Sequence, residues 1–277
     1  MSRLRFVYYM KLSFSDSVSN HRFSLKCIPQ SDERQHIHIT HKDIYPNSFI
    51  SEGRDSFGNI IIYGFEEEIH KHFFFDIEGE AEVGDFTVNN VDAESRLSFY
   101  KYQTKVTSPG EAIRTYYDDV LAHYKDELDK MFCTYGSILT NDTTAFAVYV
   151  MHRLGMDYKY MPGVTDILTK AEDAMICKEG VCQDYAHIMI SLLRMKKIPC
   201  RYVTGMMLGE GKSHAWVEVY SDGMWIGMDP TNSQLVDDFY IKIAHGRDYS
   251  DCLVNQGIFT GNVTQIQEIS VNVEEVK

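Results

Sequence analysis

The sequence lacks both a long apolar run and a cluster of basic residues, and each absence excludes a class of function. No apolar run approaches the roughly 18 residues that a membrane-spanning helix needs, so we expect no membrane partner. Acidic residues outnumber basic residues by 40 to 27, which gives a net charge of −13. Because phosphate binding draws on clustered lysine and arginine, this composition argues against nucleic acid as a partner and favours solubility.

The six cysteines are too widely spread to form the dense framework of a disulfide-stabilised domain. The first residues, MSRLRFVYYMKLSF, contain two arginines and a short apolar patch, as a secretion signal does. Their apolar and polar residues alternate, however, and no small-residue cleavage site follows, so we interpret them as a strand. Reduced thiols and a cytoplasmic location are the resulting expectations.

Alternating residues dominate the first third of the chain. Apolar side chains occupy the even positions of 4–14, and the same period of two recurs at 22–27 and 73–83. A turn-forming stretch, RDSFGN at 54–59, separates such runs. Half-buried strands joined by turns predict an antiparallel β-sandwich. The histidines of this region are scattered, so we expect no metal site there.

The pattern changes to helices after residue 107. The segment SPGE at 108–111 has the residues of a capping box with proline in the first helical position. A second helix is predicted over 142–156, and TKAE at 169–172 offers another capping box before a short helix. Strand-like runs follow the helix that begins near Cys182.

Helices first and strands after them, without alternation, predict an α+β domain in which helices pack on an antiparallel sheet. The change of pattern lies between about residues 85 and 107. We therefore predict two domains, a β-sandwich at 1–100 and an α+β domain at 101–277.

Cys182 lies in the segment GVCQDYAHIM, where an apolar stripe predicts the start of an amphipathic helix. The helix ends by KKIPC, because Pro199 prevents its continuation. Gly180 allows a tight approach of the chain, with a positive φ as one option. Cys182 then lies in the first turn, where unpaired N–H groups and the helix dipole favour the reactive thiolate. Cysteine is also among the most buried residue types, so the position alone leaves a packing role open.

A base and an orienting carboxylate are predicted from the segment SHAWVEVYSDGMWIGMDPTN. Asp222-Gly223 is a strong two-residue hairpin signal between two apolar runs. With that turn Trp216 lies opposite Asp229, and His214 lies two residues from Trp216 on the same face. His214 and Asp229 are then diagonal neighbours, with Cα atoms roughly 7–8 Å apart. A three-residue loop would send the two side chains to opposite faces, and a surface histidine beside a solvated aspartate stays the alternative.

Three blocks of the sequence resemble the motifs of the transglutaminase-like superfamily, specifically of its bacterial cysteine-protease-like branch. These blocks are GVCQDYAHIM…LLRMKKIPCRYVTG, SHAWVEVY and WIGMDPTN. The resemblance implies that Cys182 is the nucleophile, His214 the base and Asp229 the orienting group. It also implies a β-sandwich followed by a papain-like, transglutaminase-like catalytic domain. The segments NHRFSLKCIP and DSFGN and the tail HGRDYSDC…GIFTGN resemble further regions of this branch.

The triad implied by this resemblance performs acyl transfer on an amide or isopeptide bond, without a cofactor. His214 takes the thiol proton, the thiolate attacks the carbonyl, and water or a second amine resolves the thioester. The backbone N–H of Cys182 is a natural oxyanion donor. The candidates for a second donor are Gln183, Tyr158 and Tyr160. Trp216 is a candidate wall of the site, although half-buried strand aromatics usually serve packing.

Three functions stay open: a cysteine peptidase or amidase, a transglutaminase-type crosslinking transferase, and a non-catalytic binding module that keeps the fold. An intact triad argues against the binding module, and the absence of an EF-hand-like calcium segment favours hydrolysis. We therefore expect a cysteine hydrolase that acts on a peptide, a protein or a small amide. A rival zinc site would use Cys177, Cys182 and His187, but the spacing is wide and a fourth ligand is missing, so no metal is expected. The sequence does not fix the oligomeric state.

Overall fold

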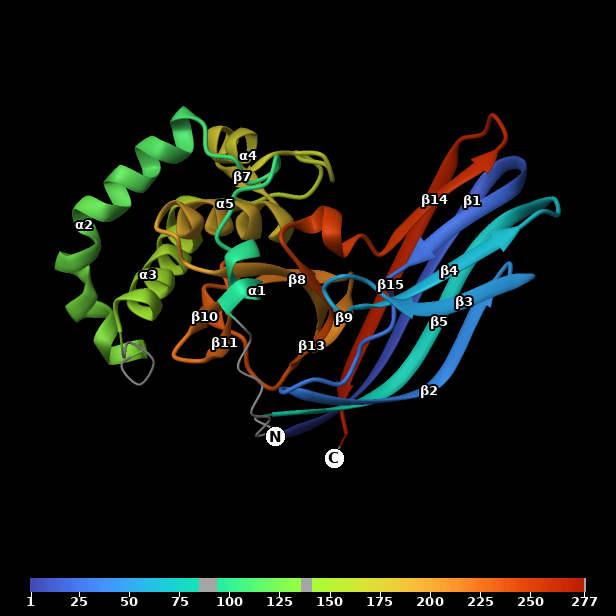
Figure 1. Ribbon diagram of the computed structural model, residues 1–277, viewed down its shortest axis with the longest axis horizontal. Helices are drawn as coiled ribbons and strands as arrows, with labels where there is room; N and C mark the ends of the chain where they lie inside the picture. The colour runs from blue at the N-terminus through green and yellow to red at the C-terminus, as the bar shows by residue number, and fades with distance from the viewer. Residues whose placement is uncertain (85–93, 136–140, 277) are drawn as a thin grey trace.

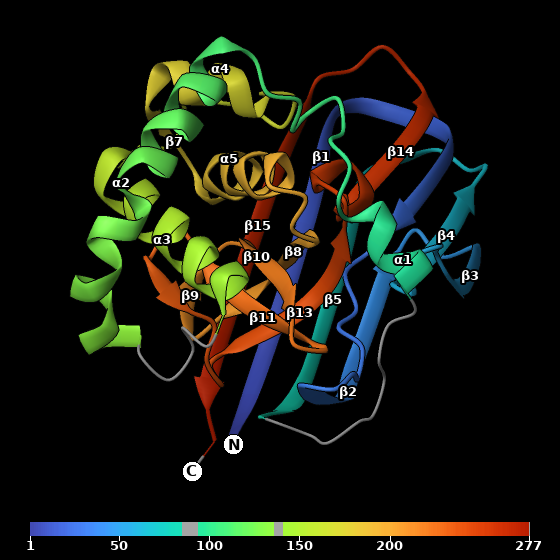
Figure 2. The same cartoon turned by 60° about the vertical axis from the view of Figure 1, so that its left-hand side comes forward.

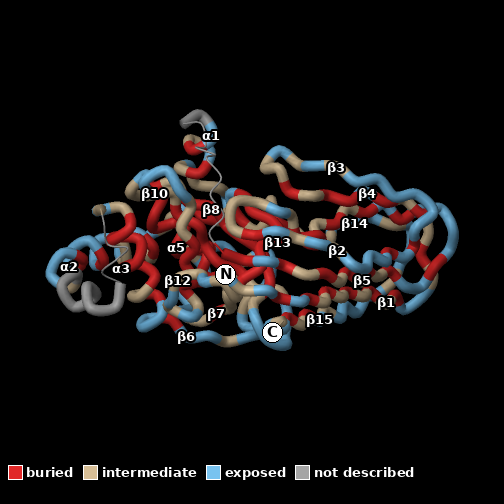
Figure 3. The backbone as a smooth tube through the Cα atoms, turned by 90° about the horizontal axis from the view of Figure 1, so that it is seen from below, coloured by how far each residue is buried: buried red, intermediate tan, exposed pale blue. Residues whose placement is uncertain are grey.

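The computed structural model describes residues 1–84, 94–135 and 141–276, which form two large antiparallel sheets, one of them covered by helices (Figure 1). The predicted α+β class is therefore confirmed. One continuous apolar core links the two sheets, and the buried residues in Figure 3 run from the helices into the long strands. Within the described ranges, no helix is long and apolar enough to cross a membrane.

The larger sheet is built on β1 (Ser2–Leu25), whose shape follows from its alternating sequence. Even-numbered side chains from Leu4 to Phe14 are buried, while the residues between them are half-buried or exposed. The other N-terminal strands are β2 (Gln35–Tyr45), β3 (Phe49–Arg54), β4 (Ile60–Glu66) and β5 (His70–Val83). β5 and β4 pair with successive parts of β1, and β2 and β3 pair outside them. The strands predicted as a sandwich thus belong to one antiparallel sheet, which curves into a half-barrel (Figure 2).

Three strands from the second half of the chain complete the larger sheet. They are β9 (Gly209–Gly211), β14 (Asn255–Thr260) and β15 (Gln265–Glu275). β15 pairs antiparallel with residues 4–14 of β1, and β14 continues along residues 19–25. β9 pairs in turn with residues 271–273 of β15. The division into domains at residue 100 stays a prediction, but strands from both sides of that boundary pair in one sheet.

The α-helices precede the smaller sheet along the chain, and a 3-10 helix follows it. They are α1 (Glu94–Phe99), α2 (Glu111–Tyr135), α3 (Asp142–Asp157), α4 (Ala171–Cys177), α5 (Cys182–Met195) and a 3-10 helix, η1 (Tyr249–Cys252). α3 confirms the helix predicted over 142–156, and it begins after Asn141, whose side chain accepts a hydrogen bond from the N–H of Thr144. A short polar side chain at this position satisfies a backbone donor that has no partner within the helix.

The caps predicted for α2 and α4 are wrong, because one side chain from α4 serves α2. The carboxylate of Glu172 accepts hydrogen bonds from the N–H groups of Gly110 (2.8 Å), Ala112 (2.8 Å) and Ile113 (3.2 Å). α4 itself begins after Lys170 with no side-chain cap. A contact between helices far apart in the sequence therefore replaces the local cap of α2, and sequence spacing alone does not reveal it.

The smaller sheet has the strand order β12-β11-β10-β8-β13. Its strands are β8 (Cys200–Met207), β10 (His214–Ser221), β11 (Met224–Asp229), β12 (Gln234–Leu235) and β13 (Tyr240–Gly246). α5 packs against β8 and β10, and α3 packs against β10 and β11. A separate parallel pair, β6 (Lys159–Tyr160) with β7 (Glu179–Gly180), leads directly to the start of α5.

Buried hydrogen bonds attach β13 to the N-terminal part of the chain. The side chain of Gln35 donates to the carbonyl of Lys242 (2.7 Å) and accepts from its N–H (2.8 Å). Asn59 makes the same two-way contact with the backbone of His245, at 2.8 and 2.9 Å. The ammonium group of Lys242 also pairs with Asp32 at 2.6 Å. Because buried amides and carbonyls need partners, these contacts hold the two sheets in a defined arrangement.

Candidate active site

Cys182 is the first residue of α5, as the sequence predicted. The thiol is only partly buried, and it lies where backbone N–H groups have no partners within the helix. The positive end of the helix dipole therefore faces a thiol that solvent can reach. The apolar stripe that fixes the helix in the core is fully buried: Ala186, Met189, Ile190 and Leu193.

The turn before α5 is shaped by Gly180 and Asp184. Asp184 Oδ2 accepts hydrogen bonds from the N–H of Val181 (2.8 Å) and the hydroxyl of Thr165 (2.7 Å). A Cβ atom on Gly180 would lie 2.5 Å from that same oxygen, so only glycine fits there. Close approach is thus the reason for this glycine, and the positive φ (54°) belongs to Lys178 at the end of α4.

His214 begins β10 and Asp229 ends β11, and the hairpin between them has the predicted register. Ser221 pairs with Met224, and the pairing continues through Tyr220 with Trp225 to Val217 with Met228. Asp222 and Gly223 both have positive φ, at 50° and 85°, as a two-residue hairpin turn requires. His214 Nε2 lies 2.7 Å from Asp229 Oδ2. The imidazole–carboxylate contact predicted across this hairpin is therefore present.

Asp229 is completely buried, and hydrogen-bond donors surround its carboxylate. Oδ2 accepts from His214, from the side-chain amide of Asn232 (2.7 Å) and from the hydroxyl of Tyr240 (2.8 Å). Oδ1 accepts from the N–H groups of Thr231 (2.9 Å) and Asn232 (3.2 Å). Burial raises the pKa of Asp229, but the hydrogen bonds from His214, Tyr240 and Asn232 outweigh it and lower the pKa below its usual value.

Two of these donors are absent from the sequence-based prediction. Asn232 lies three residues after Asp229, and short polar side chains commonly bond back to the chain at such turns, so the DPTN segment contained a signal for it. Tyr240 comes from β13, which reaches the site by pairing with β8. No local pattern in the sequence marks that long-range pairing.

The imidazole of His214 also lies within hydrogen-bonding reach of the Cys182 thiol. Because Nε2 is engaged with Asp229, Nδ1 is the nitrogen left for this contact. Burial lowers the pKa of His214, but the hydrogen bonds and charges of Asp229 and Cys182 more than compensate and raise it to about 10. The structure thus brings together three side chains from α5, β10 and β11, in the order thiol, imidazole, carboxylate.

The candidates for a second oxyanion donor have different surroundings. The amide of Gln183 donates to the carbonyl of Ile167 at 3.5 Å. Tyr158 is buried edge-on against Tyr185, with ring centroids 5.0 Å apart. Tyr160 is about half exposed, and its pKa is raised by burial and by the charge of Cys182. Of the three, Tyr160 is the side chain that combines access to solvent with proximity to the thiol.

Trp216 is buried behind the site rather than forming an open wall. Its ring meets that of Tyr240 edge-on, with centroids 5.4 Å apart, and is stacked with the ring of His214, with centroids 6.5 Å apart. Cη2 of the indole also fills the space next to Gly205, and a Cβ atom on that glycine would lie 2.3 Å from it. The packing role is therefore the one that the structure supports, and this packing fixes the His214 and Tyr240 rings in place.

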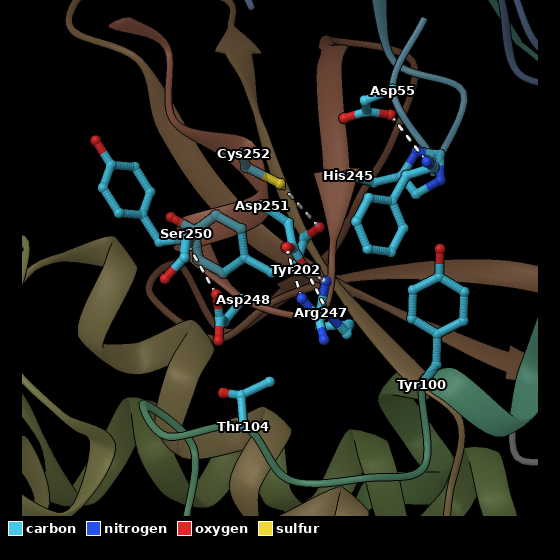
Figure 4. Close-up of polar contacts among 12 residues, drawn as sticks. Asp55, Tyr100, Thr104, Tyr202, His245, Arg247, Asp248, Ser250, Asp251 and Cys252 are labelled. Carbon is cyan, nitrogen blue, oxygen red and sulfur yellow. Dashed lines mark hydrogen bonds and ion pairs between the residues drawn. The ribbon is translucent and has the colours of Figure 1, made fainter. Parts of the chain in front are cut away.

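The segment HGRDYSDC, residues 245–252, forms the end of β13 and η1 (Figure 4). Figure 4 shows Arg247 facing Asp251, with N···O contacts of 2.8 and 2.9 Å, and Asp248 accepting from a backbone N–H at 2.8 Å. The N–H of Tyr249 donates to Nε2 of His187 at 3.2 Å. His187 is thus a buried helix residue that anchors η1.

The remaining cysteines lie apart from the triad. Cys27, Cys200 and Cys252 are buried, whereas Cys177 is exposed, and the side chain of Cys133 lies outside the described residues. Across residues 1–84, 94–135 and 141–276, no three potential ligands gather into a metal site. That the chain needs no metal or cofactor stays a prediction.

Two family models match the chain. The model of the transglutaminase-like superfamily covers residues 137–230, which include all three members of the triad, and that of the bacterial transglutaminase-like N-terminal region covers residues 4–82. The chain belongs to the transglutaminase-like superfamily. Its fold is similar to the crystal structure of a cysteine protease candidate from Cytophaga hutchinsonii, with a TM-score of 0.70 and 21% identity. That match covers 100% of this chain and 91% of the other, and at this identity it shows the shared fold.

This superfamily member is also similar to mycobacterial proteins. It is 36% identical over 138 residues to an uncharacterized protein of Mycobacterium tuberculosis, a match that covers 44% of each chain. It is 39% identical over 112 residues to an uncharacterized protein of Mycobacterium leprae, covering 37% of this chain and 40% of the other. The chain therefore spans less than half the length of these curated relatives.

Proposed function

We propose that the chain is a thiol-dependent acyl-transfer enzyme, a cysteine peptidase or amidase that cleaves amide or isopeptide bonds in a peptide or protein substrate. One observation carries this proposal. His214, held by the buried Asp229 at 2.7 Å, reaches the thiol of Cys182 at the first residue of a helix. A nucleophile, a base and an orienting carboxylate in this sequence of contacts are the parts that covalent acyl transfer requires.

In the first half of the reaction, His214 Nδ1 accepts the proton of Cys182 and the sulfur attacks the substrate carbonyl carbon. The carbonyl electron pair moves onto oxygen, next to the backbone N–H of Cys182 at the helix start. As the oxyanion collapses, the C–N bond breaks and the leaving amine takes the proton from His214. The product is a thioester between Cys182 and the acyl part of the substrate.

In the second half, His214 takes a proton from water, and the hydroxyl attacks the thioester carbonyl. The C–S bond breaks, the sulfur recovers the proton, and the acid leaves. Asp229 stays ionised throughout and holds the imidazole in one tautomer, because its own lone pairs are occupied by donors. We assign the second oxyanion contact to Tyr160, the half-exposed candidate whose pKa is raised by burial and by the charge of Cys182.

The test is the rate of alkylation by iodoacetamide, measured on the full chain with the labelled cysteine identified by mass spectrometry. Cys177 is an internal control, because it is exposed whereas Cys182 is only partly exposed. We expect Cys182 to react faster than Cys177 at about pH 6, well below the usual ionisation of a thiol near pH 8.5. The advantage should disappear in His214→Ala and shrink in Asp229→Asn.

The triad would be refuted if Cys177 were labelled faster than Cys182 at every pH and both variants were labelled at the unmodified rate. The binding module would then be the function left. If the triad is reactive, a thioester formed from an activated peptide ester is then challenged with water alone or with a primary amine. Release of free acid in the presence of excess amine supports hydrolysis. If the amide with the added amine is the main product, the chain is a crosslinking transferase and not a hydrolase.

A further inference from the structure

The loop between β6 and α4, residues 161–170, lies beside the first turn of α5 and is fastened to it. The N–H of Met161 donates to the carbonyl of Gly180 at 2.8 Å. The hydroxyl of Thr165 donates to Asp184 at 2.7 Å, and this carboxylate also binds the N–H immediately before Cys182. The loop therefore borders the nucleophile from one side, and its contacts fix it to the same turn.

This loop exposes apolar side chains close to Cys182. Val164, Ile167 and Leu168 are 46%, 59% and 78% exposed, so about half or more of each side chain lies in water. Single exposed apolar residues are common on protein surfaces, but several within five positions, next to a reactive group, indicate a binding surface. α5 itself, by contrast, buries its isoleucine and leucine side chains in the core.

The turn that carries these side chains is held rigid by hydrogen bonds. Asp166 Oδ1 accepts from the N–H of Leu168 (2.8 Å), and the N–H of Asp166 donates to the hydroxyl of Thr169 (3.0 Å). The N–H of Thr169 donates back to the carbonyl of Asp166 at 3.2 Å. Ile167 and Leu168 form the tip of this turn. A turn held in this way presents its apolar side chains in one arrangement, which reduces the entropic cost of binding.

We propose that Val164, Ile167 and Leu168 form an apolar lip that binds an apolar side chain of the polypeptide substrate, next to the carbonyl that Cys182 attacks. The inference rests on the proposed function and adds the substrate class to it: peptides with leucine, isoleucine, phenylalanine or a similar residue adjoining the cleaved bond. Covering the lip removes its apolar surface from water only while the substrate lies over the thiol. Binding at the lip therefore aligns the carbonyl with the nucleophile.

The test uses reagents that need only a reactive Cys182, and not a known substrate. N-acetyl-X chloromethyl ketones with X as Leu, Phe, Ser or Asp alkylate the thiol, and the second-order rate of each is divided by the rate with iodoacetamide. We expect a preference of about tenfold for Leu and Phe over Ser. The double variant Ile167→Ser/Leu168→Ser should lose this preference while its rate with iodoacetamide is unchanged.

The matched control is Ile258→Ser/Ile266→Ser, which changes two equally exposed isoleucines on β14 and β15 of the larger sheet. This variant should keep the preference of the unmodified chain. Equal rates for all four reagents, or a preference that survives in the Ile167→Ser/Leu168→Ser variant, would overturn the lip while the triad stands. Slow labelling of Cys182 by iodoacetamide itself would overturn the proposed function and the lip together.

A second copy of the chain is the competing occupant of this surface. Sedimentation of the unmodified chain and of the Ile167→Ser/Leu168→Ser variant distinguishes the two cases. We expect the same mass for both. A dimer that dissociates only in the variant would show that the lip is an interface between copies, and it would overturn the proposal.

Discussion

Removing one donor from the buried carboxylate tests how far Asp229 depends on its surroundings. In Tyr240→Phe the hydroxyl that donates to Asp229 Oδ2 at 2.8 Å is lost, while the ring that packs on Trp216 remains. A hydrogen bond to a charged acceptor contributes about 1.5–3 kcal/mol to the free energy of unfolding. Because Asp229 is completely buried, water does not replace the missing donor.

We therefore expect Tyr240→Phe to lose about 2 kcal/mol of unfolding free energy at neutral pH, which lowers the Tm by about 4–8 °C. The same loss raises the pKa of Asp229 from its lowered value, because one of the donors that stabilise the carboxylate is gone. The carboxylate stays ionised at neutral pH, so alkylation of Cys182 should slow by less than about tenfold. Calorimetry and the iodoacetamide rate are the two measurements.

The control is Tyr63→Phe, which removes the hydroxyl of an exposed strand tyrosine and should leave both quantities unchanged. An unchanged Tm in Tyr240→Phe would refute the reasoning, because a buried carboxylate would then tolerate the loss of a donor without cost. A collapse of the alkylation rate to that of His214→Ala would also contradict it. In that case the geometry of the whole site would depend on Tyr240, and not only the one hydrogen bond that it donates to Asp229.

Three further predictions follow from other parts of the structure. Because the pKa of His214 is raised to about 10, its contribution to stability is complete below about pH 6.5, decreases above that pH and is lost as the pH rises through about 10; urea unfolding should show a weaker pH dependence in His214→Gln. Gly180→Ala forces a Cβ atom to within 2.5 Å of Asp184, so we expect a loss of about 1–3 kcal/mol and slower alkylation; unchanged values would contradict the close approach. Asn59→Ala leaves the N–H and carbonyl of His245 unpaired in the core, and we expect a loss of about 2–4 kcal/mol in urea unfolding, with unaltered stability as the contrary result.

Local patterns in the sequence were sufficient for the parts of the site that depend on neighbours along the chain. The helix start at Cys182 follows from an apolar stripe and a preceding glycine, and the contact between His214 and Asp229 follows from one two-residue turn. In each case a short segment sets the geometry. A period of 3.6 or a hairpin register can be read without knowing the rest of the fold.

The parts that sequence patterns missed depend on pairings between distant segments. Tyr240 reaches Asp229 only because β13 lies beside β8, and Glu172 caps a helix that begins about 60 residues earlier. The strand pattern of residues 265–275 was visible, but its partner, β1, lies at the other end of the chain. Alternation shows that a strand has one apolar face and does not show which strand it pairs with.

The pairing of β9 with β15 has a consequence for the order in which the protein matures during synthesis. β9 ends at Gly211 and is separated by two residues from the strand that begins with His214, and its partner spans residues 271–273. Cys182, His214 and Asp229 are all synthesised before that partner. A nascent chain can therefore form the thiol-bearing helix early, but the loop leading to the base gains its sheet partner only after residue 273 has emerged.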